Sequence, residues 1–257
     1  MNNSKDRLYF RQLLSGRDFA QDDQIAQQMI NFVYFIGDRE TGEAVIVDPA
    51  YDIQGLLKVL ESDGMKCTGV LATHYHPDHV GGSMMGYNIA GVKELLEHTS
   101  VPIHAQQNET QFIQKVTGIG QHEIITHEGS ETISVGKIDI ELIHTPGHTS
   151  NHLCYALLEE SALFSGDHVM GWSTTVVSPP DGNMGDYMCS LKRLSQRPEK
   201  KFWPTHGPSI DEPDIFVPAL IKHRYDREEQ IMQSVGAGIT NIPEIVKYLY
   251  HDVSCIV

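Results

Sequence analysis

The spacing of apolar residues changes several times along the chain, and each change predicts a different element. Two short apolar runs, residues 31–36 and 44–47, flank a Thr-Gly pair and predict a β-hairpin. Apolar residues then recur with the i, i+3, i+4, i+7 spacing of an amphipathic helix over residues 53–60. A short apolar strand at residues 69–72 leads directly into His74. A helix, a strand and a further helix are predicted next, at residues 92–96, 101–105 and 112–116.

After residue 121 the apolar spacing shortens to two, which is typical of half-buried strands. A helix at residues 186–194 and a last short strand at 201–203 follow, and the pattern beyond Pro213 is helical. We therefore expect a mixed α/β domain over residues 1–210 and a helical segment over residues 211–257. The strands that the short spacing predicts, the first three as a β-meander, are residues 122–126, 132–135, 138–143, 153–158 and 162–164.

Composition narrows the classes of function. The chain has 257 residues, and 19 Lys and Arg against 34 Asp and Glu give a formal net charge of −15. A protein this acidic is not expected to bind duplex nucleic acid strongly or to adhere to an anionic membrane. No apolar run is long enough to span a bilayer, and residues 1–6 show no signal-peptide core. The four cysteines lie apart without a CxxC pair, which favours reduced thiols and a cytoplasmic location.

Histidine is the residue type whose distribution stands out. There are 14 in all, and three of them lie with an aspartate in the stretch Thr-His-Tyr-His-Pro-Asp-His. His74 and His76 are two residues apart, so in an extended stretch they point the same way and can bind one ion. Pro77 interrupts the alternation, and Asp78 and His79 therefore leave the backbone in other directions, toward a second ion. Imidazole and carboxylate ligands together suit Zn²⁺, Fe or Mn²⁺.

Three later residues share one feature, because each follows a predicted strand: His148, Asp167 and His206. Loops at the ends of neighbouring strands can meet along one edge of a sheet, which is where functional side chains are often carried. Glycines stand beside all three residues and let the backbone turn tightly next to a metal. We therefore expect these residues to join the cluster that follows the strand at residues 69–72.

These motifs, in this order, resemble those of the metallo-β-lactamase fold superfamily. They are HxHxDH at residues 74–79, Thr-Pro-Gly-His-Thr at 145–149, Ser-Gly-Asp at 165–167 and Thr-His-Gly at 205–207. The resemblance implies a four-layer αββα sandwich with two metal ions at one edge of its sheets. It implies that Asp167 bridges the ions and that Asp48 orients the ligand loop from behind. The other ligands that it implies are His74, His76 and His148 for the first ion, and Asp78, His79 and His206 for the second.

The sequence differs from some branches of this superfamily, and these differences indicate which branch it resembles most. Zinc β-lactamases of the main subclass carry a Cys where Asp167 stands, and no Cys occupies a ligand position here. Glyoxalase II-type thioesterases share all seven ligands, but their Gly-Asp motif continues into a Gly-Cys-Gly-Arg-like turn that this chain does not have. The stretches that are instead similar to the beta-lactamase-like protein 2 group, whose C-terminal part is a small winged-helix-like domain, are residues 166–176, 186–188, 190–191, 227–231 and 242–244. Because the sequence stops at Val257, we expect residues 211–257 to form only the first helices of such a domain, truncated or reduced.

The resemblance implies a metal-dependent hydrolase that cleaves an ester-type bond in a thioester, ester, lactone or phosphodiester. Two zinc ions, with iron or manganese as alternatives, would share a water and lower its pKa, so that a bridging hydroxide is the nucleophile. Asp78 is expected to orient this hydroxide, and Asp167 or a metal-bound water to pass a proton to the leaving group. His168 and Trp172 follow the bridging ligand and are the residues expected to face the substrate.

Alternative functions stay open at this point. Some members of the beta-lactamase-like protein 2 group cleave single-stranded RNA, so a short RNA is a candidate substrate beside a small molecule. Related di-iron proteins reduce oxygen or nitric oxide, but they normally need a flavin domain that this sequence does not show. A binding module with structural metals fits poorly, because a closed structural site uses four ligands whereas this set leaves a bridging position open. The sequence also leaves open whether the chain forms a homo-oligomer.

Overall fold

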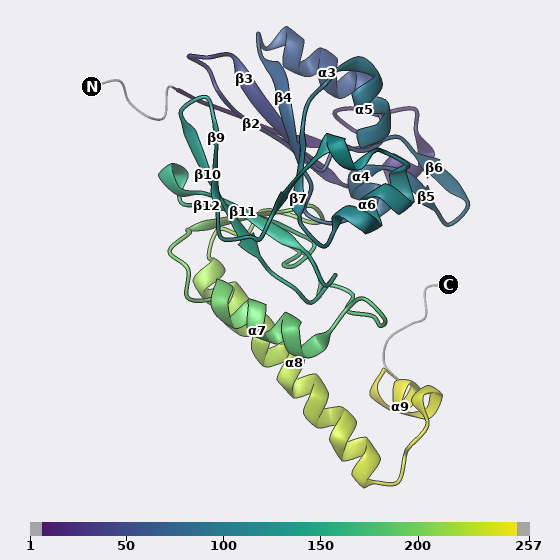
Figure 1. The fold of residues 1–257 in the computed structure, drawn as a ribbon. Helices are drawn as coiled ribbons and strands as arrows, with labels where there is room; N and C mark the ends of the chain where they lie inside the picture. The colour runs from purple at the N-terminus through teal and green to yellow at the C-terminus, as the bar shows by residue number, and fades with distance from the viewer. Residues whose placement is uncertain (1–6, 251–257) are drawn as a thin grey trace.

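A computed structural model describes residues 7–250 of the chain. Two sheets stack face to face, and helices cover the outer face of each (Figure 1). The first sheet has six strands in the order β1 (Leu8–Leu14), β2 (Phe32–Asp38), β3 (Glu43–Val47), β4 (Lys66–Leu71), β7 (Ile103–Gln106) and β8 (Ile124–His127). The second has five in the order β13 (Lys201–Pro204), β12 (Ala162–Gly166), β11 (Leu153–Leu157), β10 (Ile138–His144) and β9 (Thr132–Val135).

The helices divide between the two outer faces. Residues 82–89 form a small hairpin of β5 (Gly82–Met84) and β6 (Tyr87–Ile89). Two 3₁₀ turns lie at Gln121–Glu123 and Leu158–Glu160. The helices of the N-terminal part are α2 (Gln24–Met29), α3 (Ile53–Ser62), α4 (Pro77–Val80), α5 (Val92–His98) and α6 (Thr110–Thr117). Those of the C-terminal part are α7 (Met184–Leu194), α8 (Pro213–Gly236) and α9 (Ile242–Leu249).

The side-chain alternation of the strands builds the layers. In β2, Val33 packs into the core beneath the first group of helices, whereas Tyr34 packs into the core between the two sheets. In β11, Tyr155 joins the same core between the sheets, and Cys154 packs on the other side against Leu191 of α7. Successive residues of a strand point to opposite faces, so a strand covered on both sides is apolar throughout. This arrangement confirms the predicted αββα sandwich.

One predicted pairing is wrong. The strand expected at residues 122–126 is β8, but it does not form a meander with β9. It pairs in parallel with β7 at the edge of the first sheet, with Ile103 opposite Ile124. The physical reason is that Ile124 is buried in the core beneath the N-terminal helices, and α6 supplies the crossover that a parallel pair needs. The sequence reading also omitted β1, which pairs antiparallel with β2 and buries Tyr9 and Leu13.

The C-terminal helices are present as expected. The Asn183 side chain accepts a hydrogen bond from the Asp186 amide at 3.1 Å and caps α7, which therefore begins at Met184, two residues before its predicted start. Val217 and Leu220 of α8 are buried beside α7, while the far half of α8 extends away from the sheets and α9 folds back beside it (Figure 1). The structure describes these helices, and the domain boundary between residues 210 and 211 stays a prediction.

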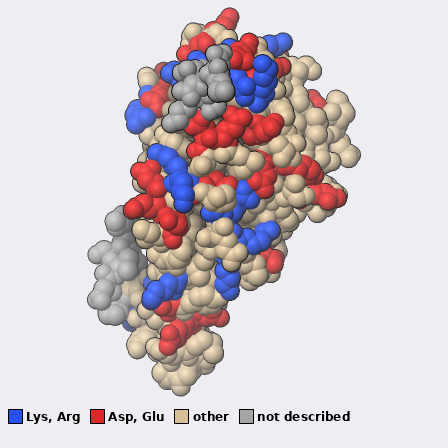
Figure 2. Space-filling model, turned by 90° about the vertical axis from the view of Figure 1, so that its left-hand side faces the viewer, with Lys and Arg blue, Asp and Glu red and all other residues tan. Residues whose placement is uncertain are grey.

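Two further expectations concern the whole chain. Cys67, Cys154 and Cys189 are free thiols, as expected, whereas Cys255 lies outside the described residues. Within residues 7–250, no helix combines the length and the apolar character that crossing a membrane requires. On the face shown in Figure 2, Lys and Arg are interspersed with Asp and Glu. The cytoplasmic location and the oligomeric state stay predictions.

Candidate metal centre

The loops that follow four strands meet at one edge of the sandwich. In the second sheet β10, β12 and β13 run in the same direction, so their carboxyl ends lie together. The loop after β4 of the first sheet joins them there, since the Leu153 amide donates to the Thr73 carbonyl at 2.8 Å. The edge therefore gathers all seven residues predicted as ligands: His74, His76, Asp78 and His79 after β4, His148 after β10, Asp167 after β12 and His206 after β13.

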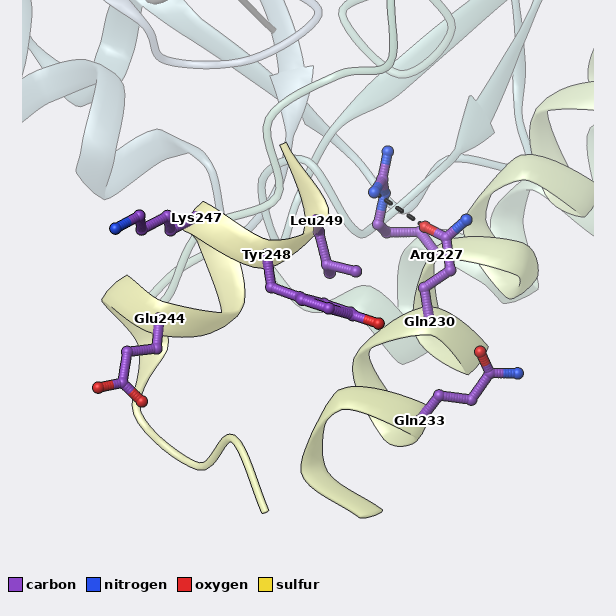
Figure 3. Close-up of a pocket in the computed structure, with 7 residues that line it drawn as sticks. All are labelled: Arg227, Gln230, Gln233, Glu244, Lys247, Tyr248 and Leu249. Carbon is purple, nitrogen blue, oxygen red and sulfur yellow. Dashed lines mark hydrogen bonds between the residues drawn. The ribbon is translucent and has the colours of Figure 1, made fainter. Parts of the chain in front are cut away.

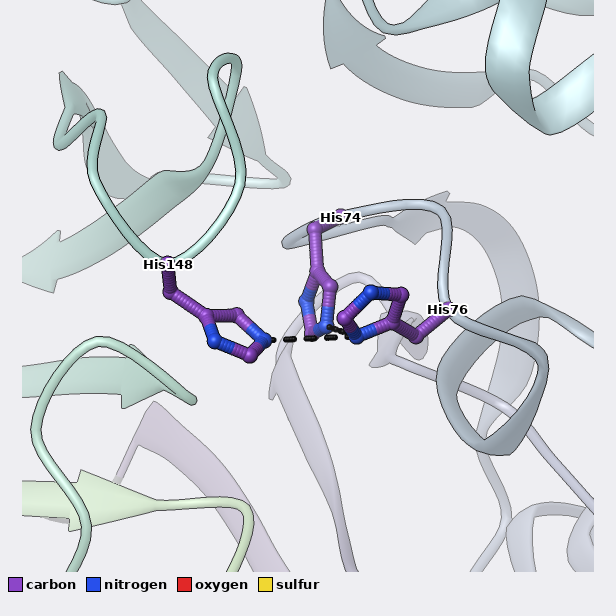
Figure 4. Close-up of side chains that lie close together, drawn as sticks. All are labelled: His74, His76 and His148. Carbon is purple, nitrogen blue, oxygen red and sulfur yellow. Dashed lines mark hydrogen bonds between the residues drawn. The ribbon is translucent and has the colours of Figure 1, made fainter. Parts of the chain in front are cut away.

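Three histidines form the first group (Figure 4). The His76 Nδ1 atom lies 2.9 Å from His74 Nε2 and 3.3 Å from His148 Nε2. The His148 ring is fixed from behind, because its Nδ1 donates to the Val176 carbonyl at 2.7 Å and leaves the lone pair of Nε2 facing the other rings. Burial lowers the pKa of His74 well below its usual value and that of His76 to about 4. Both are therefore neutral imidazoles, the form that binds a metal.

Asp78, His79 and His206 form the second group. The Asp78 Oδ2 atom lies 3.6 Å from His79 Nε2 and 3.4 Å from His206 Nε2. Burial on its own would raise the pKa of Asp78, but the facing His79 and His206 outweigh it and hold that pKa at about 2. Asp78 is therefore ionised at neutral pH, and the group offers one carboxylate and two ring nitrogens to a cation.

Asp167 stands between the two groups. Its Oδ1 atom lies 3.6 Å from the Nε2 atoms of both His79 and His206, while its Oδ2 atom lies 3.8 Å from His148 Nε2. Burial opposes ionisation, but the three histidines outweigh it and hold the pKa of Asp167 well below its usual value. Among the described residues, His79 Nε2 and Asp167 Oδ1 are buried polar atoms without a hydrogen-bond partner. Buried polar atoms are normally satisfied, so these two fit ligands of a cation between them.

Asp48 holds two of the histidines from behind. Its Oδ2 atom accepts a hydrogen bond from His79 Nδ1 at 2.9 Å and another from the Thr73 hydroxyl at 2.7 Å. The Thr73 oxygen in turn lies 2.9 Å from His74 Nδ1 and accepts from it. Since both rings use Nδ1 in this way, the lone pairs of their Nε2 atoms face the site. The position matches the orienting role implied for Asp48.

Several supporting residues were not identified from the sequence. The Asn31 amide donates to the Asp78 carbonyl at 3.0 Å and to its Oδ2 atom at 3.1 Å, and the Tyr51 hydroxyl donates to Asn31 Oδ1 at 3.0 Å. His152 is fully buried, and its Nε2 atom accepts from the Asp167 amide at 3.3 Å. No local spacing marks Asn31 or Tyr51. His152 could have been noticed because it directly precedes β11 at the same edge.

The two residues expected to face the substrate, His168 and Trp172, differ in their exposure to solvent. The His168 side chain is 0% exposed and packs between the rings of His152 and Tyr187, at 5.7 and 4.8 Å between centroids. A substrate-facing role for His168 is therefore wrong: the residue lies in the turn after β12, where its amide donates to the Ser165 carbonyl at 3.0 Å, and its ring packs toward α7 while Asp167 faces the metal groups. Trp172 is 53% exposed, and its ring stacks on His206 with 6.4 Å between centroids. Its contact with substrate stays a prediction.

Glu109 supports the loop between two ligands. Its side chain, on a residue only 1% exposed, accepts a hydrogen bond from the Tyr75 amide at 2.8 Å, and Tyr75 separates His74 from His76. Burial raises the pKa of Glu109 from 4.5 to about 7, against a lowering by the Tyr75 amide. Between these two pKa values the unfolded chain loses the proton and the folded chain keeps it. The free energy of unfolding therefore falls as pH rises from about 4.5 to about 7, by an amount on the order of 3 kcal/mol.

Replacing Glu109 with Gln should remove this pH dependence. The amide oxygen can still accept from the Tyr75 amide, but the side chain cannot ionise. We expect the unfolding free energy of Glu109→Gln, relative to the parent, to rise between pH 5 and pH 8, as measured by denaturant titration at each pH. Glu97→Gln, on an exposed position of α5, is the control and should follow the parent at every pH. Parallel curves for Glu109→Gln and the parent would contradict the buried-carboxyl explanation.

Comparison with known proteins identifies the family. The family model of the metallo-beta-lactamase superfamily matches residues 27–206, which is more than half of the chain and contains every ligand described above. This chain belongs to the metallo-beta-lactamase superfamily. The resemblance drawn from the motifs is thereby confirmed. The two groups described above, and a third formed by His74, His79 and Asp167, are each a potential metal site of this superfamily member.

Curated relatives cover most of the chain. A beta-lactamase-like protein 2 homolog of Caenorhabditis elegans is 34% identical over 194 residues, which are 76% of this chain and 59% of that protein. An atrochrysone carboxyl ACP thioesterase of Pseudocercospora fijiensis is 30% identical over 184 residues, which are 72% of this chain and 49% of that protein. The chain thus spans about half to three fifths of the length of these relatives.

Solved structures support the same fold. The BLEG-1 B3 metallo-beta-lactamase superposes with a TM-score of 0.61 at 22% identity, over 79% of this chain and 93% of that one. TTHA1623 in a di-iron-bound form superposes with a TM-score of 0.58 at 23% identity, over 71% of this chain and 90% of that one. At such identities the likeness extends to the fold alone.

Proposed function

We propose that this chain is a dinuclear zinc hydrolase whose substrate is a thioester. The observation that carries the proposal is the position of the Asp167 carboxylate, whose Oδ1 faces His79 and His206 while its Oδ2 faces His148. A carboxylate in this position suits two cations held side by side. All seven donor groups are imidazoles or carboxylates, a set that suits zinc, with iron and manganese as alternatives.

Two zinc ions bound here would polarise the thioester carbonyl and lower the pKa of a water molecule toward neutrality. The protein's own part is to orient the reacting groups. Asp78 is ionised and held by Asn31, so it can accept a hydrogen bond from the attacking water and fix its direction. As the water oxygen bonds to the carbonyl carbon and the carbon–sulfur bond breaks, the water loses a proton, which Asp167, between the two groups, can relay to the leaving sulfur. Trp172 supplies a flat apolar surface beside His206, against which the acyl part can rest.

The choice of a thioester over a phosphodiester rests on two observations. One relative that covers most of this chain bears the name of a thioesterase acting on an acyl carrier protein substrate. The net charge of −15 disfavours a long polyanionic substrate. A small-molecule thioester therefore suits this chain better than single-stranded RNA, and hydrolysis accounts for the ligand set without the redox partner that a di-iron oxygen reductase needs.

The test combines metal content with a substrate panel. The purified protein is analysed for zinc, iron and manganese, and hydrolysis of an acyl thioester, an aryl ester, a lactone and a short single-stranded RNA is measured at equal concentrations. We expect close to two zinc ions per chain and hydrolysis of the thioester, lost on chelation and restored by added zinc. A preparation that holds two ions and cleaves RNA but no thioester would overturn the substrate assignment. A chain that binds at most one ion after zinc supplementation would overturn the dinuclear site.

A further inference from the structure

A groove of about 760 Å³ lies between α7 and α8, on the outer side of the second sheet. Its apolar wall consists of side chains that the fold leaves partly open to solvent: Met184 is 42% exposed, Ile231 39% and Met232 65%. Methionine side chains are flexible and polarisable, so they adapt to ligands of irregular shape. Apolar side chains gathered around a concave surface are typical of a binding site.

The same groove gathers three cations. Lys192, Arg224 and Arg227 line it, and within residues 7–250 none of the three is paired with a carboxylate. Lys192 lies over the Tyr225 ring at 5.3 Å. Arg227 donates to the Gln230 amide oxygen at 2.9 Å, and it also lines the neighbouring pocket between α8 and α9 that Figure 3 draws. Glu228 also lines the groove, so its lining carries three cations against one carboxylate. In a chain with 34 acidic and 19 basic residues, this local excess of positive charge favours an anionic ligand.

Each wall of the groove contacts a loop that carries a metal ligand. At the start of α7, the Asn183 amide donates to the Gly147 carbonyl at 2.9 Å, next to His148. On α8, Arg224 donates to the Thr175 carbonyl at 2.5 Å, and the Thr175 hydroxyl lies 3.1 Å from His148 Nδ1. The groove therefore begins beside the metal groups and follows α7 away from them. Lys192 lies nine residues beyond Asn183, about 13 Å along the helix.

We propose that this groove binds the thiol-side arm of the thioester substrate, a chain of methylene and amide groups that ends in a phosphate. The assignment rests on the proposed thioesterase function and names the class of its leaving group. The apolar wall of Met184, Ile231 and Met232 suits the carbon chain of the arm, and Lys192 and Arg227 suit the terminal phosphate. Such an arm is shared by coenzyme A and by the prosthetic group of acyl carrier proteins.

Single-stranded RNA fits the groove less well. An RNA strand carries a phosphate on every nucleotide and requires cations along its whole path, with aromatic rings for its bases. Here the lining offers few cations and also carries Glu228, which disfavours a polyanion, while Met184, Ile231 and Met232 supply apolar surface. One anionic group at the end of an apolar chain matches this distribution.

The test compares two thioesters with the same acyl group. One carries coenzyme A, and the other carries N-acetylcysteamine, which lacks the distal part of the arm and its phosphate. The double variant Lys192→Gln, Arg227→Gln should lose about tenfold in kcat/KM toward the coenzyme A thioester and keep the parent value toward the short one. Arg224 is left intact because it holds Thr175 against His148. Lys222→Gln, on α8 outside the groove and paired with Asp226, is the matched control.

The outcomes separate the groove from the proposed function. If the double variant loses kcat/KM equally toward both thioesters, or loses none toward the coenzyme A thioester, the assignment of the groove to the thiol-side arm is wrong. If neither thioester is hydrolysed, the proposed function fails, but the ligand assigned to the groove can still be tested by calorimetry of coenzyme A binding to the zinc-loaded protein. Binding that the double variant weakens supports the assignment. Undetectable binding, or binding that the double variant leaves unchanged, overturns it. To separate the two sources of the arm, the same acyl group is also presented on an acyl carrier protein. Cleavage of RNA that the double variant weakens would favour a nucleic-acid surface and contradict the proposal.

Discussion

The variant Asp167→Asn is expected to fold like the parent and to lose at least about a hundredfold in hydrolytic activity, with close to one metal ion per chain in place of two. The exchange keeps the side-chain volume, and the His152 bond to the backbone amide is untouched. It replaces one carboxylate oxygen by an amide nitrogen, which cannot bind a cation. The side chain then offers an oxygen either to the His79 and His206 side or to the His148 side, but not to both.

Two controls accompany this variant. Asp186→Asn makes the same chemical change at an exposed position of α7. His104→Asn removes a half-buried histidine that contacts His127 on the neighbouring strand, at 2.9 Å between ring nitrogens, and lies outside the metal groups. Activity on the active substrate and metal content by elemental analysis are measured for all three variants. Equal activity in Asp167→Asn and His104→Asn would show that the site has been placed wrongly.

The variant Asp48→Asn is expected to bind metal about tenfold to a hundredfold more weakly than the parent, without direct contact to any ion. The Asp48 carboxylate accepts from three donors: the Thr73 amide, the Thr73 hydroxyl and His79 Nδ1. In the Asn side chain only the oxygen can accept a hydrogen bond. The nitrogen that replaces the second carboxylate oxygen therefore faces a donor group and cannot accept from it. The His79 ring then favours the tautomer that carries its proton on Nε2, the atom that faces the site. Titration of the metal-free protein with zinc against a competing chelator measures the loss.

The matched control for this variant is Asp38→Asn. Asp38 is also fully buried and accepts from two backbone amides, those of Lys137 and Glu40, at 2.8 and 2.9 Å. It lies at the end of β2, and its bonds hold a turn rather than a ligand loop. We expect Asp38→Asn to lower the unfolding free energy and to leave zinc affinity unchanged. If both variants lower stability and neither changes zinc affinity, Asp48 supports the fold and does not orient the ligands.

Local patterns in the sequence predicted most of the elements, though not β1, and the side chains that carry the chemistry. The run that ends β4 and the four ligand-type residues behind it are neighbours in the chain, so their directions follow from backbone geometry over a few residues. The same holds for His148, Asp167 and His206, each placed by the strand that precedes it. The order of these motifs was also sufficient to identify the superfamily.

The tertiary structure alone decided which distant segments support those ligands. Asn31 meets Asp78 across 47 positions and Glu109 meets Tyr75 across 34, and no local spacing predicts contacts at such separations. The same reason explains the pairing of β8 with β7, because a strand's alternation fixes its two faces but not its neighbour. His168 is adjacent to a ligand in sequence, yet packing against α7 buries it. Spacing along the chain fixes the direction of side chains over a few residues, whereas the burial of a side chain depends on which distant segments pack against it.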